Sequence, residues 1–201
     1  MRAVATREDI EDLILDAAHR LLALRGYKRM TMDDLAKEVG IAKGTLYLHF
    51  PSKEELVLSH IDRLVARLES ELLKIARGAG TPAERVRRML IMRVMFRFDG
   101  VRHYAESLND LLASIRPSLQ VRRERHFKEE AGIFAEVLRE GWRGLPPAAA
   151  ETFATAHALL LATNALLPYS LSPSELGRRS DVEKKVSRIA DLLLCGLPLK
   201  K

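Results

Sequence analysis

The stretch GIAKGTLYLHFPSKEE, residues 40–55, determines how the N-terminal part of the chain is organised. Ile41, Leu46 and Phe50 recur at a spacing that predicts the buried side of a short helix. Five other residues of this stretch fall on a face that has no apolar reason to be buried. They are Lys43, Gly44, Thr45, Tyr47 and His49. A short helix that turns hydrogen-bonding groups outward suits the groove of a DNA duplex.

The residues before this helix predict another helix and a tight turn. Thr31 is followed three positions later by Asp34, which is the spacing of a capping box, and Leu35 then begins an apolar helical face. Gly40 marks the end of that helix, because glycine readily adopts the left-handed conformation of a helix terminus. The predicted unit is therefore a helix, a glycine turn and a short helix.

The residues after the short helix predict the start of the next one. Ser52 can cap that helix, and Glu55, at the third helical position, can reciprocate. Lys53 then lies at a helix N-terminus, where free N–H groups and the helix dipole already favour an anion. We therefore expect Lys53 to help bind a phosphate.

Together these residues resemble the N-terminal signature of the TetR family of bacterial transcriptional regulators. The resemblance covers roughly residues 7 to 60, at fixed spacing without a gap. It rests on Gly26, Tyr27, Thr31, Leu35, Ala36, Val39, Gly40, Ile41, Gly44, Thr45, Leu46, Tyr47 and the run from His49 to Glu54. The family usually has Ser or Thr where this chain has Ala42, so one helix cap, worth about 1 kcal/mol, is missing.

The resemblance implies a homodimeric transcriptional regulator whose double-stranded DNA operator is palindromic. Two reading helices would enter successive major grooves, with half-site centres about 34 to 36 Å apart or a multiple of that distance. Lys43 and Thr45 would contact base edges, and Gly44 would permit a close approach. Phosphates would be held by Thr31, Tyr47, His49 and Lys53. By the same resemblance, a small-molecule effector in the C-terminal part would release the DNA.

The composition is that of a globular protein, with 47% apolar and 30% charged residues among 201. The chain has no run of 18 apolar residues, and its first 15 residues are too polar for a signal peptide. We therefore expect a cytoplasmic protein without membrane association. The net charge of +6 is a weak argument for DNA binding. Residues 1–55 hold nine Lys and Arg against ten Asp and Glu, and the basic excess lies further on.

Helical patterns bounded by caps, Gly or Pro continue to the end of the chain and predict an all-α fold. We expect an N-terminal three-helix DNA-binding domain over residues 1–55 and a helical effector-binding and dimerisation domain over residues 56–201. In the second domain the predicted helices cover about 56–77, 81–98, 101–115, 117–141, 146–167 and a last one capped by Ser180. Pro117 is expected to separate two of these helices.

Flexible, aromatic and sparsely polar residues of the second domain are typical of an apolar ligand cavity. Most of them could equally be ordinary core. The candidate lining residues are Met89, Met92, Phe96, Tyr104, Phe127, Phe134, Phe153, His157 and Asn164. A neutral or hydrophobic effector would fit them.

The predicted helix over 146–167 is apolar nearly all round, which favours burial against its own domain and also against a partner chain. The last helix is its expected companion in a homodimer interface. The candidate interface residues are Phe153, Ala154, Leu161, Ala165, Val186, Ile189 and Leu193.

Enzyme chemistry finds little support in the sequence, which lacks phosphate-cradling loops, nucleophile elbows and zinc-site motifs. His103, His126 and His157 could in principle meet, yet ordinary roles on helix faces explain them better. We expect neither a metal nor a cofactor. A TetR-like DNA-binding protein controlled by a protein partner, or without any inducer, remains the main alternative.

Overall fold

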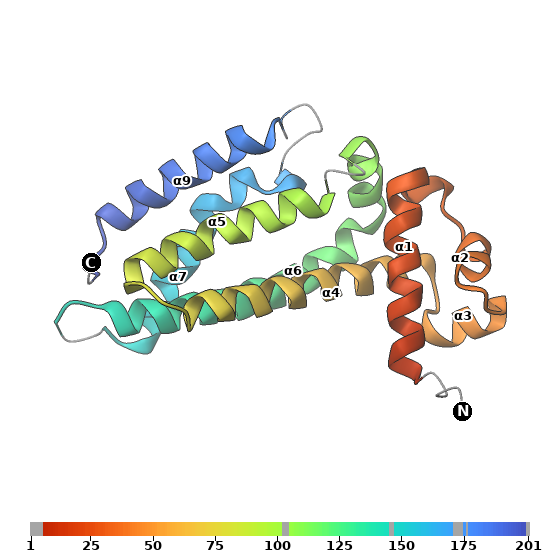
Figure 1. The fold of residues 1–201 in the computed structure, drawn as a ribbon, viewed down its shortest axis with the longest axis horizontal. Coiled ribbons are helices and arrows are strands. Elements are labelled where there is room, and N and C mark those ends of the chain that lie inside the picture. Colours follow the sequence, from red (N-terminus) through yellow and green to blue (C-terminus); the bar gives the residue numbers. More distant parts are fainter. Residues whose placement is uncertain (1–5, 102–104, 145–146, 171–174, 176, 200–201) are drawn as a thin grey trace. The chain divides into compact units, whose positions relative to one another are not determined.

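The computed structural model describes residues 6–101, 105–144, 147–170, 175 and 177–199, and Figure 1 traces its helices. These are α1 (Arg7–Arg29), α2 (Met32–Val39), α3 (Lys43–His49), α4 (Lys53–Ala76), α5 (Pro82–Val101), α6 (Ala105–Gly141), α7 (Ala149–Thr163) and α9 (Arg179–Cys195), with short 3-10 turns at Asn164–Leu166 and Pro168–Ser170. The described residues contain no β-strand, only an isolated bridge between Trp142 and Leu199. The all-α prediction is confirmed.

The chain forms two compact units. The first comprises Met1–Leu64 and His103–Leu119, and the second comprises Val65–Arg102 and Gln120–Lys201. Both α4 and α6 contribute residues to each unit. The predicted domain boundary after residue 55 falls in the first turn of α4, whereas the first unit continues beyond it and also takes in the N-terminal half of α6.

The first unit is built around the buried side of α1. Ile14, Ala17 and Ala18 are fully buried there, and Leu35 of α2 and Leu46 of α3 are equally inaccessible. Apolar residues from α4 and the first half of α6 complete this core; they are Leu56, Val57, Leu58, Leu108, Leu111, Ile115 and Leu119. Burial of this apolar area fixes the short helices α2 and α3, which are too short to be stable in isolation.

Gly26 interrupts α1, as the sequence indicated. Its φ of 70° lies in the left-handed region, where glycine has no steric penalty. A β-carbon at this position would also lie 2.8 Å from the β-carbon of Ser107 in α6. Position 26 therefore requires glycine for two independent reasons: the left-handed backbone conformation and the close approach of α6.

Reciprocal N-terminal caps form at three helices, among them the predicted cap at Thr31. Thr6 and Asp9 make a reciprocal capping box at α1, and Thr31 and Asp34 do the same at α2. At α5 the Thr81 hydroxyl accepts from the backbone N–H of Glu84, whose carboxylate accepts from the N–H of Thr81. These local patterns locate the helix starts reliably because the cap is made by residues three positions apart.

Two predicted helix boundaries are wrong. α6 runs without a break from Ala105 to Gly141 with Pro117 inside it, although proline removes one backbone hydrogen bond. Packing of apolar residues on both sides of the proline, from Leu108 to Phe134, outweighs that loss. Ser180 does not cap the last helix, since α9 begins at Arg179 and its N-cap residue is Arg178.

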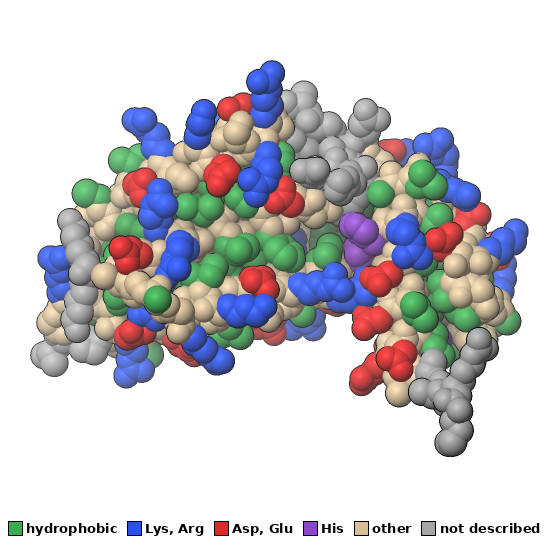
Figure 2. All heavy atoms as spheres, viewed as in Figure 1, with side chains coloured by type: hydrophobic (Ala, Val, Ile, Leu, Met, Phe, Trp, Pro, Cys, Tyr) green, Lys and Arg blue, Asp and Glu red, His purple; other side chains and the backbone are tan. Residues whose placement is uncertain are grey.

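The second unit has its own hydrophobic core, to which α4, α5, α6, α7 and α9 all contribute. Its fully buried members include Leu72, Met89, Phe134, Leu160 and Ala190. Over α5 and α9, Figure 2 shows basic, acidic and hydrophobic side chains interspersed. The basic excess of the C-terminal part is therefore not gathered into one patch on this face, which favours a solvated surface.

Within the described ranges, no helix combines the length and the apolar character needed to cross a bilayer.

Candidate nucleic-acid interface

The turn between α2 and α3 has the geometry that the sequence indicated. Gly40 adopts a left-handed conformation with φ 77°, and its N–H donates to the carbonyls of Ala36 and Lys37. Leu46 is fully buried and Phe50 is 5% exposed, so they anchor the inner side of α3. The first unit thus contains a helix-turn-helix with a fixed inner face and a free outer one.

Four of the candidate contact residues lie on the outer part of α3. Lys43, Gly44 and Tyr47 are exposed, and Thr45 is half-buried. A β-carbon at Gly44 would meet nothing within 4 Å, so the missing side chain leaves the backbone open to a large partner. This surface offers an ammonium and two hydroxyls, which can hydrogen-bond to DNA, and Gly44 allows the backbone to come close to it.

Lys43 is engaged in an ion pair with a neighbouring helix. Its Nζ lies 2.7 Å from Oδ1 of Asp33 in α2, and both side chains remain more than half exposed. The hydrogen bond with Asp33 raises the pKa of Lys43 above its ordinary value. The lysine is therefore a fully charged group that must exchange a carboxylate for a base or phosphate when it meets DNA.

His49 and Thr31 point their polar atoms toward the protein. His49 is 10% exposed, and its Nδ1 lies 3.1 Å from Oε1 of Glu11 in α1. The hydrogen bond from Arg7, followed by that from His49, lowers the pKa of Glu11. Thr31 donates its hydroxyl to Asp34 Oδ2 at 2.7 Å within the capping box. Phosphate contacts by these two residues stay predictions, and each would require an existing hydrogen bond to be shared or broken.

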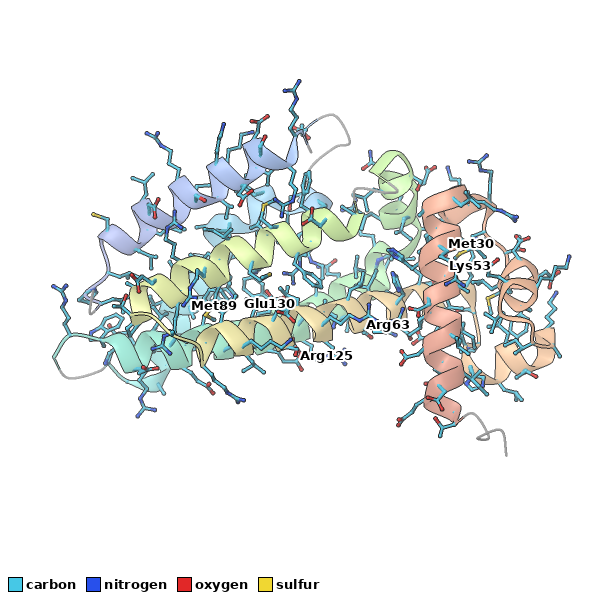
Figure 3. The ribbon with its side chains drawn as sticks, in the orientation of Figure 1. Met30, Lys53, Arg63, Met89, Arg125 and Glu130 are labelled. Atoms are coloured by element: carbon cyan, nitrogen blue, oxygen red, sulfur yellow. The ribbon has the colours of Figure 1, made fainter. Side chains whose placement is uncertain are left out.

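Lys53 makes a contact that the sequence reasoning did not foresee. Its ammonium donates to the backbone carbonyls of Tyr27 and Met30, each at 3.1 Å, and lies 4.3 Å from the centre of the Tyr27 ring (Figure 3). Partial burial lowers its pKa. The lysine at the start of α4 therefore satisfies carbonyls where α1 ends, and the phosphate contact expected of it stays a prediction that would compete with these hydrogen bonds.

Leu48 was missed by the sequence analysis. It lies in the middle of α3 and is 81% exposed. The apolar spacing of α3 could have identified it, because Leu46 and Phe50 already account for the buried side and Leu48 falls between them.

Most of the predicted pocket residues belong to the core of the second unit. Met89 and Phe134 are fully buried in it, and Met92, Phe96, Phe127 and Phe153 are partly buried against it. The rings of His157 and Phe127 form a T-shaped contact, with 4.7 Å between ring centres. Tyr104 lies outside the described residues. The structure assigns these side chains to packing, and a cavity among them stays a prediction.

Asn164 takes part in a buried ionic network that the sequence did not reveal. Arg93 and Glu130 are each 1% exposed and are joined by a hydrogen bond of 2.7 Å. Arg93 also donates to Thr163 Oγ1 and to Asn164 Oδ1, while Arg97 pairs with the other oxygen of Glu130. Burial raises the pKa of Glu130, but the charges of Arg97 and Arg93 outweigh burial and lower it.

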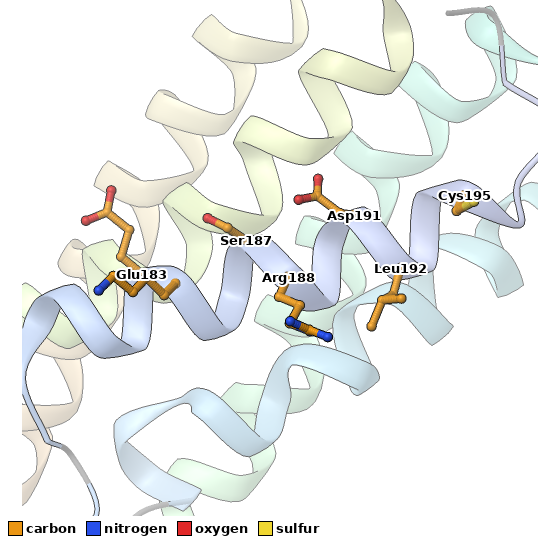
Figure 4. A pocket seen from close by; sticks show the side chains of 7 residues that line it. Glu183, Ser187, Arg188, Asp191, Leu192 and Cys195 are labelled. Atoms are coloured by element: carbon orange, nitrogen blue, oxygen red, sulfur yellow. The ribbon is translucent and has the colours of Figure 1, made fainter.

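One predicted dimer-interface residue is wrong. Val186 is fully buried within its own unit, where no partner can reach it. Ala154, Leu161 and Ala165 are exposed, and Phe153, Ile189 and Leu193 are half-buried. The outer side of α9 carries an open groove of about 670 Å³, shown in Figure 4, that includes the 67% exposed Leu192. The groove on α9 is lined mainly by polar and charged side chains, whereas Ala154 and Leu161 are exposed apolar residues of α7, and the dimer interface stays a prediction.

Metal chemistry finds no support in the part of the chain that the structure describes. There, no group of three or more His, Cys, Asp and Glu side chains could hold an ion.

A helix-turn-helix with an anchored inner face and an exposed outer face is typical of DNA-binding proteins. Residues 14–59 match the family described as "Bacterial regulatory proteins, tetR family". This match to a family of regulatory proteins agrees with the resemblance seen in the sequence, and it covers the helix-turn-helix and less than a quarter of the 201 residues.

Curated relatives match a limited part of the chain. The transcriptional regulator EthR of Mycolicibacterium smegmatis is 46% identical over 63 residues, which is 31% of this chain and 29% of the relative. The transcriptional repressor KstR of the same species is 35% identical over 77 residues, or 38% of each chain. The matched segments therefore span well under half of these relatives.

Solved structures show that the fold continues over the whole chain. A transcriptional regulator from Cytophaga hutchinsonii has a TM-score of 0.72 and 22% identity, covering 93% of this chain and 97% of its own. A TetR/AcrR-family regulator from Thermobifida fusca has a TM-score of 0.62 and 22% identity, covering 94% and 98%. At this identity the likeness establishes the fold of the second unit and nothing about its ligand.

Proposed function

We propose that the protein is a DNA-binding transcriptional repressor that acts as a homodimer on a palindromic operator in the bacterial cytoplasm. The outer face of α3 is the observation that carries this proposal. It joins Lys43, Gly44, Thr45 and Tyr47 on an accessible surface of a helix-turn-helix that matches the TetR family. Lys43 can donate to guanine O6 and N7, and Thr45 can hydrogen-bond to either kind of base edge.

Pairing of two chains is supported by the outer sides of α7 and α9. Ala154 and Leu161 on α7, Ala165 in the turn that follows it and Leu192 on α9 are apolar and exposed, and α7 and α9 pack against each other. A stable interface typically covers about 800 Å² on each partner with an apolar centre. A twofold pairing through this surface would give the operator its palindromic symmetry.

Control by a small, mostly apolar effector is supported by the character of the second unit. The guanidinium of Arg93 lies over the ring of Phe127, 5.7 Å from its centre, and the network of Arg93, Glu130 and Asn164 could orient a polar end of a ligand. The effector would release DNA by binding the conformer with low DNA affinity more tightly, and its differential affinity limits the effect.

The test begins with selection of DNA from a random double-stranded pool by the purified full-length protein. We expect one palindromic sequence, bound by a dimer, with half-sites about 34 to 36 Å apart or a multiple. Equal affinity for selected and random DNA at physiological salt would overturn the proposal. A thermal-shift screen of apolar compounds should then find ligands that stabilise the protein and release the operator. If no compound releases the operator from the protein, control by a protein partner is favoured instead.

A further inference from the structure

Leu48 of α3 is an exposed leucine to which the proposed function gives no role. At 81% exposure it is the most accessible of the large hydrophobic side chains in the described part of the chain. A single exposed leucine is ordinary on a protein surface. This one lies in the centre of the helix that the proposed function assigns to reading DNA, where every neighbour on the outer face is polar or lacks a side chain.

The position of Leu48 relative to Gly44 defines a small apolar recess. The two residues are four positions apart, so they lie one above the other on the same face of α3. Helical side chains lean toward the N-terminus, which directs Leu48 over the preceding turn. That turn holds Gly44, where a β-carbon would find open space. The leucine methyl groups are therefore beside the open space over Gly44, which a large partner could fill.

The chemistry of the major groove restricts what can fill this gap. Base edges there present hydrogen-bond donors and acceptors, apart from the 5-methyl group of thymine. Leucine can satisfy neither donors nor acceptors, and covering one would leave a buried polar group without a partner. A thymine methyl group loses nothing by contact with leucine and gains apolar burial.

We propose that Leu48 is a specificity-determining residue that contacts the 5-methyl group of one thymine in each half-site, beside Gly44. The inference rests on the proposed function and deepens it, since it names the base that the apolar part of α3 reads. The same side chain placed on a deoxyribose would be indifferent to the base, and the experiment separates these two contacts.

The experiment removes one methyl group at a time. In the operator selected by the full-length protein, each thymine is replaced by deoxyuridine, symmetrically in both half-sites, and the affinity is measured at fixed salt. At one position we expect a loss of about fourfold per methyl group, and hence about sixteenfold for the two half-sites together. Leu48→Ala should weaken binding to the thymine operator and should no longer distinguish thymine from deoxyuridine at that position.

Leu24→Ala provides the matched control, because Leu24 is a 75% exposed leucine on α1. It should keep the full response to methyl removal. Selective operator binding without any response to deoxyuridine would overturn this inference and leave the proposed function intact. An equal loss for Leu48→Ala on both operators would also overturn it. If the protein selects no sequence at all, the proposed function fails and this inference fails with it.

Discussion

At the scale of single residues, Lys53 shows how a charge that appears free in the sequence can be used within the fold. Its ammonium donates to the carbonyls of Tyr27 and Met30, near the interruption of α1 at Gly26. Replacing the lysine would leave these carbonyls without their donor. Methionine keeps most of the apolar stem and removes only the charge.

Lys53→Met should therefore lower the free energy of unfolding by about 1 to 2 kcal/mol, measured by denaturant titration. It should leave the salt dependence of operator binding unchanged. Lys37→Met is the control, since Lys37 is an exposed lysine of the same unit and its loss should cost little stability. A slope of log K against log salt that falls by about 0.9 per chain in Lys53→Met would instead identify Lys53 as a phosphate contact.

At the scale of helices, α3 has a start without a side-chain cap. The N-cap residue Ala42 has φ −66° and ψ 145°, a conformation that serine adopts readily, but its side chain makes no hydrogen bond to the helix. α1 and α2 have complete capping boxes by comparison. The reading helix is thus locally less stable than its neighbours.

Ala42→Ser should raise the free energy of unfolding by about 0.5 to 2 kcal/mol, because its hydroxyl can accept an N–H of the first turn. Chemical denaturation gives the change directly. Ala42→Val is the control, as it adds a side chain without an acceptor and should not stabilise the protein. An equal effect of serine and valine would show that the gain is not a cap.

The ionic network ties α5 to α6 and to the end of α7. Glu130→Gln would leave Arg93 buried with an incomplete partner, and we expect a loss of about 3 to 5 kcal/mol in the free energy of unfolding. Glu124→Gln on the same helix removes an exposed carboxylate paired with Lys128 and should cost less than about 0.5 kcal/mol. Similar losses in both variants would mean that burial of the pair has no energetic importance.

The same network determines how the stability of the folded protein changes with pH. The pKa of Glu130 is lower in the folded protein than its ordinary value of 4.5, so the stabilisation is complete above that value. It is lost as the pH falls below 4.5 toward the folded pKa. In acid titrations followed by circular dichroism, wild type should therefore lose stability more steeply below pH 4.5 than Glu130→Gln, whose side chain does not titrate.

The sequence predicted local patterns better than contacts between distant residues. The capping boxes at Thr31 and Thr81 were predictable because both partners lie within one helical turn. The contacts of Lys53 with Tyr27 and of Arg93 with Glu130 join residues 26 and 37 positions apart, which no spacing rule connects. Pro117 was misread because its local effect is unfavourable and only tertiary packing offsets it.

At the scale of the whole molecule, the central prediction is that two chains associate through the outer sides of α7 and α9. Leu161→Glu would place a charge on the exposed apolar part of α7, where Leu161 is 53% exposed. Sedimentation should then show a monomer, or a dissociation constant at least a hundredfold weaker, since burying an unpaired charge costs several kcal/mol. Operator affinity should fall in parallel.

Val121→Glu is the control for this prediction. Val121 is a 74% exposed apolar residue of α6, and the charge there should leave the dimer intact. A wild-type protein that sediments as a monomer would contradict the proposed pairing. So would a Leu161→Glu variant that remains a dimer of unchanged affinity.

The pairing of Lys43 with Asp33 has a consequence for how such a regulator searches a genome. A lysine that already holds a carboxylate adds little to the general attraction between protein and polyanion, and residues 1–55 carry one more acidic than basic side chain. Non-specific binding to chromosomal DNA is then expected to be weak. Few copies are detained at irrelevant sites, and a modest number of molecules per cell suffices to keep one promoter occupied.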